Sequence, residues 1–314
     1  MSITAATRTA APHRVGTRGL LRRFADAAVS PLSVDDLLDH FHPLRGGTGA
    51  DQVKGRIVAV QAETADAATI VIKPGRDWSG HIPGQYVRIG VDVDGIRLWR
   101  CYSLTHGPRP DGRISITVKA IPGGTVSQYL VRRAEAGEMV HLAQAEGEFV
   151  LPDPLPAKML LVTAGSGITP VIGMLRNLFS KAALPATDIV LVHSAMARDE
   201  VIFGAEMRRH AATGRLRLIE RHTDTDGLLT TADLAAAVPD LADRVAYACG
   251  PVGLLDALEE YYAEQRLPLH TERFRPALVD TDGAAGGTVT FAGAPRSPPT
   301  APPRSSTPPR TPAS

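Results

Sequence analysis

The chain has 314 residues, and 34 lysines and arginines against 33 aspartates and glutamates leave a formal net charge of +1. This length allows about two domains of ordinary size. Balanced charge without a large basic block argues against nucleic acid as a partner. The two cysteines, Cys101 and Cys249, stand far apart and in no metal-ligand spacing, so the sequence predicts neither a disulfide framework nor a metal site. This cysteine usage fits a reducing cytoplasm.

Residues 1–50 are interpreted as an N-terminal extension, of which residues 1–18 are small and polar and are expected to be disordered. Residues 20–44 place apolar and charged residues at helical spacing with a break at Pro31, which predicts two short amphipathic helices. These helices either pack against the folded body or make a peripheral contact with a partner or with the inner face of the membrane. No stretch has the apolar run of a signal peptide or a spanning helix, so we expect a cytoplasmic protein.

Residues 51–153 contain short runs rich in valine and isoleucine, separated by turns of glycine, proline and aspartate. The expected strands cover residues 55–64, 68–74, 84–93, 96–104, 112–121 and 138–147. About six short strands in about a hundred residues predict a small antiparallel β-barrel. A helix that begins after two glycines and ends at Gly137 interrupts the series.

The pattern changes in residues 157–275, where apolar runs alternate with helical patterns. The runs cover residues 159–164, 188–194, 216–223 and 245–250, and the helical patterns cover 170–182, 199–212, 230–238 and 253–265. Nearly continuous apolar runs are typical of strands buried on both faces of a parallel sheet. Their alternation with helices predicts a doubly wound α/β nucleotide-binding domain behind the barrel.

The stretch "LLVTAGSGITPVIGML" reads as a strand, a glycine turn and a helix start. Gly165 and Gly167 allow the backbone to approach a phosphate, the helix N-terminus supplies N–H donors, and Pro170 fits the first helical turn. This setting favours dinucleotide phosphate binding over a merely tight turn. A nucleophilic role for Ser166 is not favoured, because the two glycines that a nucleophile elbow needs around it are missing.

A second glycine turn, "PGGTVSQYL", precedes a helix in the first domain. The free N–H groups of that helix, with the hydroxyls of Thr125 and Ser127, could hold a phosphate, although an ordinary helix N-cap fits the stretch equally well. Two phosphate-type turns in two domains indicate two phosphorylated ligands.

The stretch "WRCYSLT" has Arg100 and Tyr102 on one face of a strand, because residues two apart in a strand share a face. A solvated strand end is the alternative. Beside two phosphate turns, however, Arg100 can hold a diphosphate, Tyr102 offers a ring on which a flat cofactor can stack, and Ser103 can reach a ring nitrogen.

Taken in order, "RCYSLT", "GGTVS", "AGSGITP" and "ACGP" resemble the motifs of the ferredoxin–NADP reductase superfamily over residues 53–274. More narrowly, "GVDVDGIRLWRCYS", "VKAIPGGTVSQYL" and "CGPVGLLDALE" resemble reductases that supply electrons to fatty-acyl desaturases and oxygenases. The resemblance implies an FAD-dependent NAD(P)H oxidoreductase. Such an enzyme passes hydride from NADPH or NADH to the flavin and then single electrons to a ferredoxin, desaturase or oxygenase partner.

The resemblance also implies site residues. FAD would be bound by Arg100, Tyr102, Ser103, Val118, Lys119, Gly123, Gly124, Val126, Ser127 and Phe274. The nicotinamide coenzyme would be bound by Gly165, Ser166, Gly167, Ile168, Thr169, Pro170, Ser194, Arg198, Arg221, Cys249, Gly250 and Pro251. Ser103, Cys249 and Glu272 would lie at the reacting rings as catalytic residues. For Cys249 the alternative is a small buried thiol in the core.

Coenzyme choice is where the sequence departs from the resemblance. Relatives that prefer NADPH carry arginines at the positions of Met196 and Leu228, two residues after Ser194 and within "DGLLT". Because a 2′-phosphate needs cationic partners, Arg198 and Arg221 are the candidates to replace them, and NADPH is slightly favoured over NADH.

Residues 276–314 are interpreted as a linker, the stub of a ferredoxin domain lost by frameshift in the gene or its sequencing, and a disordered tail rich in proline. No cysteine follows Cys249, so the chain as written is expected to hold no 2Fe–2S cluster and to need a separate ferredoxin. A catalytically idle remnant or binding module, and a plain dehydrogenase without flavin, are the alternative functions.

Overall fold

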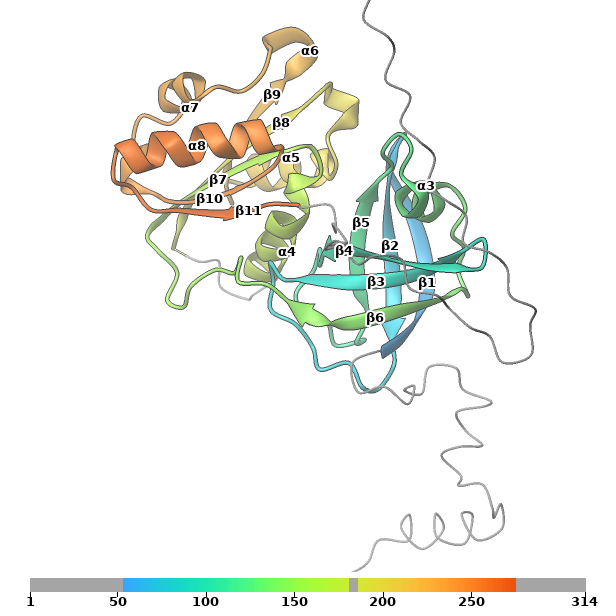
Figure 1. Cartoon of the computed structure of the whole chain (residues 1–314). Coiled ribbons are helices and arrows are strands. Elements are labelled where there is room, and N and C mark those ends of the chain that lie inside the picture. The colour runs from blue at the N-terminus through green and yellow to red at the C-terminus, as the bar shows by residue number, and fades with distance from the viewer. Residues whose placement is uncertain (1–52, 181–185, 275–314) are drawn as a thin grey trace, which may run out of the picture. The chain divides into compact units, whose positions relative to one another are not determined.

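A computed structural model describes residues 53–180 and 186–274, and it arranges them around two β-sheets (Figure 1). The expectations for the extension over residues 1–50 and for residues 276–314 lie outside the described residues. None of the helices within residues 53–180 and 186–274 is long and apolar enough to cross a membrane.

The first sheet is antiparallel and has the strand order β4-β3-β6-β1-β2-β5. Its strands are β1 (Val53–Thr64), β2 (Ala67–Pro74), β3 (Tyr86–Val93), β4 (Ile96–Ser103), β5 (Ile114–Lys119) and β6 (Met139–Glu146). An isolated bridge between Leu104 and Ile116 connects the end of β4 to β5, so the two edges of the sheet meet. The predicted antiparallel barrel is therefore confirmed. Helix α3 (Thr125–Arg132) lies between β5 and β6 and packs Val126 and Leu130 into the barrel core.

The second sheet is parallel and has the order β11-β10-β7-β8-β9. Its strands are β7 (Lys158–Ala164), β8 (Asp188–Ala195), β9 (Arg217–His222), β10 (Val245–Cys249) and β11 (Leu269–Glu272). Helices α4 (Ile168–Phe179) and α5 (Gly204–Ala212) pack on one face, whereas α7 (Thr231–Ala237) and α8 (Val252–Glu264) pack on the other. Helices on both faces confirm the doubly wound fold. The chain order reverses between β7 and β10, which is where such folds bind ligands.

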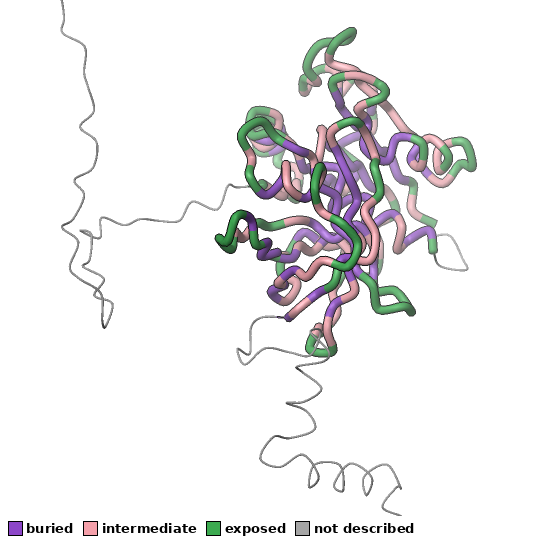
Figure 2. The backbone as a smooth tube through the Cα atoms, turned by 90° about the vertical axis from the view of Figure 1, so that its right-hand side faces the viewer, coloured by how far each residue is buried: buried purple, intermediate pink, exposed green. Residues whose placement is uncertain are grey.

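The buried residues gather in the interior of the molecule, and much of the outer surface is exposed (Figure 2). The edge strands β4 and β9 are mostly half-buried or exposed. On β7, the side chains from Met159 to Val162 are at most 1% exposed, as expected for a strand covered on both faces. Short segments complete the domain: η1 (Gly165–Gly167), η2 (Arg198–Glu200), α6 (Thr223–Asp226) and η3 (Leu241–Asp243).

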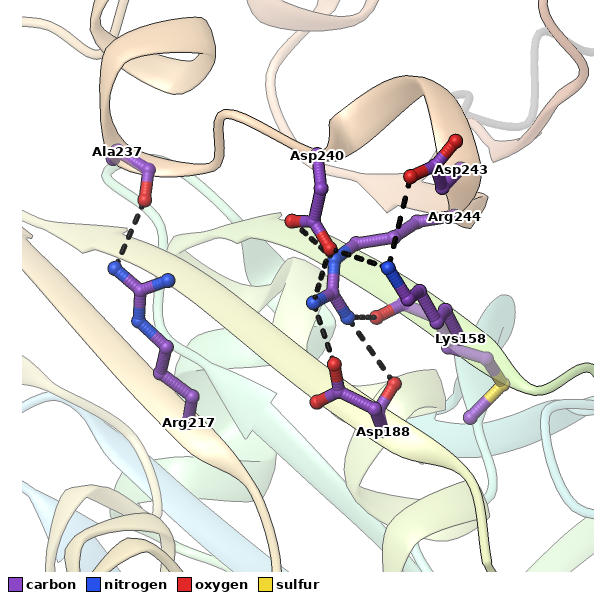
Figure 3. A network of polar contacts seen from close by, with 8 residues as sticks. Lys158, Asp188, Arg217, Ala237, Asp240, Asp243 and Arg244 are labelled. Carbon is purple, nitrogen blue, oxygen red and sulfur yellow. Dashed lines mark hydrogen bonds and ion pairs between the residues drawn. The ribbon is translucent and has the colours of Figure 1, made fainter.

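A polar network holds the amino-terminal ends of the parallel strands (Figure 3). The buried Arg244 guanidinium donates to the carboxylates of Asp188, at 2.6 Å, and Asp240, at 2.9 and 3.0 Å. Lys158 Nζ donates to the same Asp240 carboxylate at 3.0 Å. Because these residues start β7, β8 and β10, the network fixes the strands relative to each other at the end away from the glycine turn.

The two sheets lie in one compact unit and contact each other through polar groups. Arg176 of α4 donates to the backbone oxygen of Thr105 at 3.0 Å and pairs with Glu206 of α5 at 2.6 and 2.8 Å. At the other contact, Lys119 Nζ of β5 lies 3.1 Å from Asp66 and 3.2 Å from Glu200 of η2. The barrel therefore contacts both the helix that follows the glycine turn and the segment that contains Arg198.

Candidate active site

Arg100 and Tyr102 share a face of β4, as the strand pattern predicted. They lie opposite Ile89 and Val87, whose side chains belong to the barrel core. Arg100 is exposed, and its Nη1 donates to the Trp99 carbonyl at 2.7 Å. It forms no ion pair with the residues that the structure describes, so its charge is free to meet an anion. The Tyr102 ring packs against the core, and burial raises the pKa of its hydroxyl.

Ser103 ends β4 with a buried hydroxyl. The residue is 3% exposed, and within the described ranges its Oγ has no hydrogen-bond partner. Unpaired buried polar atoms are uncommon in folded proteins, and they fit a position where a ligand completes the hydrogen bonding. Ser103 lies opposite Tyr86 of β3.

The glycine turn before α3 has the form of an anion site. Gly123 has a φ of +72°, with open space where a side chain would project. Gly124 is the N-cap without a side-chain cap, and Ser127 Oγ accepts from Ile121 N and donates to Gly124 O, both at 3.3 Å. The first N–H groups of the helix are left without helical acceptors. This turn fits a diphosphate, with the Ser127 hydroxyl holding its shape.

Three further residues predicted for the flavin site have their side chains engaged elsewhere. Val118 and Val126 are each 1% exposed, and their side chains pack in the barrel core. Lys119 is paired with the carboxylates of Asp66 and Glu200.

The turn between β7 and α4 brings two of the sequence motifs together. Gly165 has a φ of +54° and open space around it. A β-carbon on Gly167 would overlap the carbonyl oxygen of Cys249, and one on Gly250 would lie 3.2 Å from the Ala164 β-carbon. Glycine at both positions thus allows the turn to lie against the end of β10, at the topological switch point.

Other residues of this turn contribute through the backbone. Thr169 Oγ1 donates to the Ser166 carbonyl at 2.9 Å and so stabilises the turn. Ile168 and Pro170 are buried, and their side chains lie in the interior. Pro251 is the exposed N-cap of α8, and Phe274 is 45% exposed after β11.

Cys249 and Glu272 are directly opposite each other on β10 and β11. Cys249 is fully buried, and burial raises the pKa of its thiol, so the thiol is neutral. Burial also raises the pKa of Glu272 to about 7, and its Oε2 has no partner within the described part of the chain. Burial raises the pKa of Tyr86, the residue opposite Ser103, and the charges of Glu146 and Glu272 add to that increase.

The two arginines predicted to select the coenzyme differ in how far their side chains are already engaged in contacts within the protein. Arg198 has a side chain that is 68% exposed, 3.8 Å from Glu220. Arg221 instead donates to the carbonyls of Gly227 and Asp226 and lies 3.3 Å from Asp233. Arg198 is therefore the more available cation of the two.

Ser194 is 5% exposed at the end of β8, so its hydroxyl lies within the domain. Met196 and Leu228, which stand where arginine was expected, are 60% and 79% exposed. Met196 directly follows β8, and Leu228 follows the short helix α6 after β9.

Sequence reasoning missed Tyr86, His193 and the pairing of Lys119. A histidine inside the apolar run "DIVLVHS" was the available signal for His193. Tyr86 gave no such signal, because the effect of the Glu272 charge on its pKa joins residues of two different sheets. Within residues 53–180 and 186–274, no group of three or more His, Cys, Asp or Glu side chains is arranged to hold a metal ion.

Comparison with known proteins agrees with this arrangement. Residues 56–151 match the model of the oxidoreductase FAD-binding domain, and residues 161–260 match that of the oxidoreductase NAD-binding domain. An NADPH oxidoreductase of Mycobacterium tuberculosis is 43% identical over 279 residues, which are 87% of this chain and 72% of that protein.

The ferredoxin reductase component of the 3-ketosteroid-9-alpha-monooxygenase of Mycolicibacterium smegmatis is 30% identical over 244 residues, 74% of this chain and 68% of that protein. The flavohem-like FAD/NAD-binding domain of nitric oxide dioxygenase from Vibrio cholerae shares the fold, with a TM-score of 0.61 and 24% identity over 72% of this chain and 100% of that one. The chain therefore belongs to the ferredoxin–NADP reductase superfamily and is an NAD(P)H-dependent flavin oxidoreductase.

Proposed function

We propose that this chain takes hydride from NADPH or NADH onto FAD and passes the electrons singly to a ferredoxin, or to the iron–sulfur protein of an oxygenase or desaturase. One observation carries the proposal. Ser103 Oγ and Glu272 Oε2 are buried polar atoms without partners in the described ranges, and they come from different sheets. Burial raises the pKa of Tyr86, which lies opposite Ser103, and the charge of Glu272 contributes to that increase, so the proposal takes both atoms to face one cofactor site.

In the proposed site, Arg100 and the turn at Gly123 and Gly124 hold the FAD diphosphate, and Tyr102 stacks on the flavin ring. The turn from Gly165 to Gly167 and the N-terminus of α4 hold the coenzyme diphosphate. The bound cofactors supply the redox chemistry, because a flavin accepts a two-electron hydride and can release electrons one at a time. The protein aligns the two ring systems and excludes water.

Side chains at the junction divide the remaining tasks. Ser103 Oγ can hydrogen-bond to a ring nitrogen of the flavin. With a pKa near 7, Glu272 can hold or release a proton at neutral pH. Cys249 acts through its volume, because its buried thiol is neutral and packs beside the nicotinamide position without acting as a nucleophile.

The acceptor class is supported by the relatives. The protein of M. smegmatis is the ferredoxin reductase component of a monooxygenase, and a glycine betaine monooxygenase reductase subunit of Pseudomonas aeruginosa is 30% identical over 207 residues. We extend to this chain the role of an electron source for such an oxygenase.

The test begins with anaerobic addition of NADPH or NADH to the purified yellow protein, followed by an added plant-type ferredoxin or ferricyanide. We expect bleaching of the flavin and then reduction of the ferredoxin. Glu272→Gln and Ser103→Ala should slow bleaching while FAD stays bound. Glu146→Gln is the matched control, because Glu146 also lies near Tyr86 but is exposed.

Two outcomes contradict the proposal. Flavin that stays yellow in excess NADPH and NADH would support the idle remnant. Reduction of ferricyanide without reduction of any ferredoxin would limit the chain to small acceptors and remove the protein partner.

A further inference from the structure

Five side chains form one row across the parallel sheet, one from each strand. In register, and in the order β11, β10, β7, β8 and β9, they are Glu272, Cys249, Thr163, His193 and Glu220. Because residues in register on adjacent strands point to the same face, all five lie on the face that α4 and α5 cover. The five strands lie side by side in this order in Figure 1.

Most side chains in this row are polar, whereas most side chains in the neighbouring row on the same face are apolar. Two residues earlier on the same strands stand His270, Tyr247, Leu161, Leu191 and Leu218. Thr163 and His193 are both 0% exposed, and Thr163 Oγ1 lies 2.8 Å from His193 Nδ1. This hydrogen bond satisfies Nδ1 alone, since His193 Nε2 is buried without a hydrogen-bond partner among the described residues. In a low-dielectric interior a buried hydrogen bond of this kind favours one arrangement of its neighbours.

His193 takes part in this pair as a neutral imidazole. Burial lowers the pKa of His193 to about 4. In the neutral ring one nitrogen donates and the other accepts, so the ring can pair with a hydroxyl in either direction. The ionisable groups that act on it are Glu220, His222 and Arg208, and Glu220 is paired with Arg208 at 2.7 and 2.9 Å.

Thr163 and His193 each come shortly before a segment that is proposed to hold the coenzyme. Thr163 is two residues before Gly165, the first glycine of the phosphate turn, and His193 immediately precedes Ser194. At the end of the row, Glu220 lies 3.8 Å from the Arg198 guanidinium. The hydrogen bond between Thr163 and His193 thus joins the strand that leads to the diphosphate turn with the strand that leads to Arg198.

We propose that Thr163 and His193 are positioning residues for the nicotinamide coenzyme. Their hydrogen bond fixes the carboxyl ends of β7 and β8 relative to each other, so that the phosphate turn and the Ser194–Arg198 segment bind one dinucleotide at the same time. Neither residue touches the reacting atoms. The inference rests on the proposed function, since it assumes that the coenzyme binds across these two strand ends.

The experiment measures binding of NADP⁺ to the FAD-loaded protein by titration calorimetry, together with flavin reduction by NADPH in a stopped-flow instrument. Thr163→Val keeps the shape of the side chain and removes its hydroxyl, and His193→Leu removes the ring. Loss of one buried neutral hydrogen bond should weaken NADP⁺ binding about fivefold. The rate of reduction at saturating NADPH should change less than about twofold, because the groups at the reacting rings are untouched.

Conservative variants separate positioning from packing. Thr163→Ser retains the hydroxyl and His193→Asn retains a polar atom at the Nδ1 position, so both should bind NADP⁺ with nearly the parental Kd. The double variant Thr163→Val, His193→Leu should bind NADP⁺ no more weakly than the weaker-binding single variant. Each single substitution already removes the whole hydrogen bond between the two residues, so the second substitution removes nothing further.

The inference is overturned if Thr163→Val and His193→Leu lower the melting temperature but bind NADP⁺ like the parent, which would make the pair an element of the core alone. It is also overturned if Thr163→Ser and His193→Asn weaken binding as much as the apolar variants. A parent that binds NADP⁺ but is reduced by neither NADPH nor NADH would contradict the proposed function, while the Kd comparison would still decide the inference.

Discussion

Gly167 lies so close to Cys249 that a β-carbon on Gly167 would overlap the Cys249 carbonyl oxygen. This contact holds the phosphate turn against the end of β10, although the two segments are far apart in the sequence. It makes Gly167 a packing residue as well as a phosphate-turn residue.

Gly167→Ala should therefore destabilise the protein and weaken coenzyme binding. Forcing a methyl group against a backbone carbonyl in a packed interior costs about 1–3 kcal/mol. Gly253→Ala is the control, because nothing lies within 4 Å of the added β-carbon there. Urea denaturation and the Kd of NADP⁺ are the measurements. Equal stability and affinity of the two variants would show that the turn relaxes to accept the methyl group.

Arg100→Ala and Tyr102→Ala should each lower FAD content without unfolding the barrel. Loss of a charge-assisted diphosphate contact or of ring stacking should weaken FAD binding about tenfold or more. Arg97→Ala is the matched control on the same strand, since Arg97 is exposed and pairs with Asp92 at 2.8 Å. The absorbance of flavin per protein after gel filtration measures the effect, and full retention of FAD by both variants would remove β4 from the flavin site.

Glu272 should make stability fall as the pH rises. Its pKa is about 7 in the folded chain against an ordinary value of 4.5, so the folded state holds a proton that the unfolded state has already released. Between pH 5 and 8 this difference should lower the free energy of unfolding by about 2–3 kcal/mol. In Glu272→Gln that part of the pH dependence should vanish, as measured by urea denaturation at both pH values. An unchanged slope in the variant would show that Glu272 is ionised at pH 5.

Arg198→Ala should lower the preference for NADPH over NADH more than Arg221→Ala does. Arg221 is already engaged by Asp233 and by two backbone carbonyls, whereas Arg198 is 68% exposed. Loss of a guanidinium from a 2′-phosphate should reduce kcat/KM for NADPH about tenfold and leave the value for NADH nearly unchanged. If the ratio of kcat/KM for NADPH to that for NADH changes only in Arg221→Ala, the prediction is wrong. Arg221 would then exchange its hydrogen bonds to the backbone carbonyls for contacts with the coenzyme.

One predicted helix begins later than its sequence pattern indicated. Residues 199–212 alternate in a helical manner, but α5 starts only at Gly204. Phe203 has a φ of +60°, and the preceding Val201 and Ile202 are buried in the core. The aromatic side chain is held by tertiary contacts, including the Arg176 guanidinium 4.6 Å from its ring centre. Burial of these three apolar residues outweighed their local helical preference.

Much of the molecule was decided by the sequence alone, because its signals are local. Alternating apolar residues with turn residues determined the barrel, and continuous apolar runs between helical patterns determined four of the parallel strands. Strand β11 was not predicted, because Leu269–Glu272 is short and not a continuous apolar run. The glycine turns at Gly124 and Gly165 and the shared face of Arg100 and Tyr102 follow from neighbours in the chain.

Only the tertiary structure decided which of these groups meet and in what state. Cys249 and Glu272 share a register because β11 adds beside β10, and the pKa of Glu272 is raised because that position is buried. Lys119 pairs with Asp66 and with Glu200, which are distant from it in the sequence. Arg221 donates to the Gly227 carbonyl of its own loop, and this contact depends on how the loop closes. Burial and charge pairing depend on all the groups that surround a residue in space, and the order of residues along the chain does not give those groups.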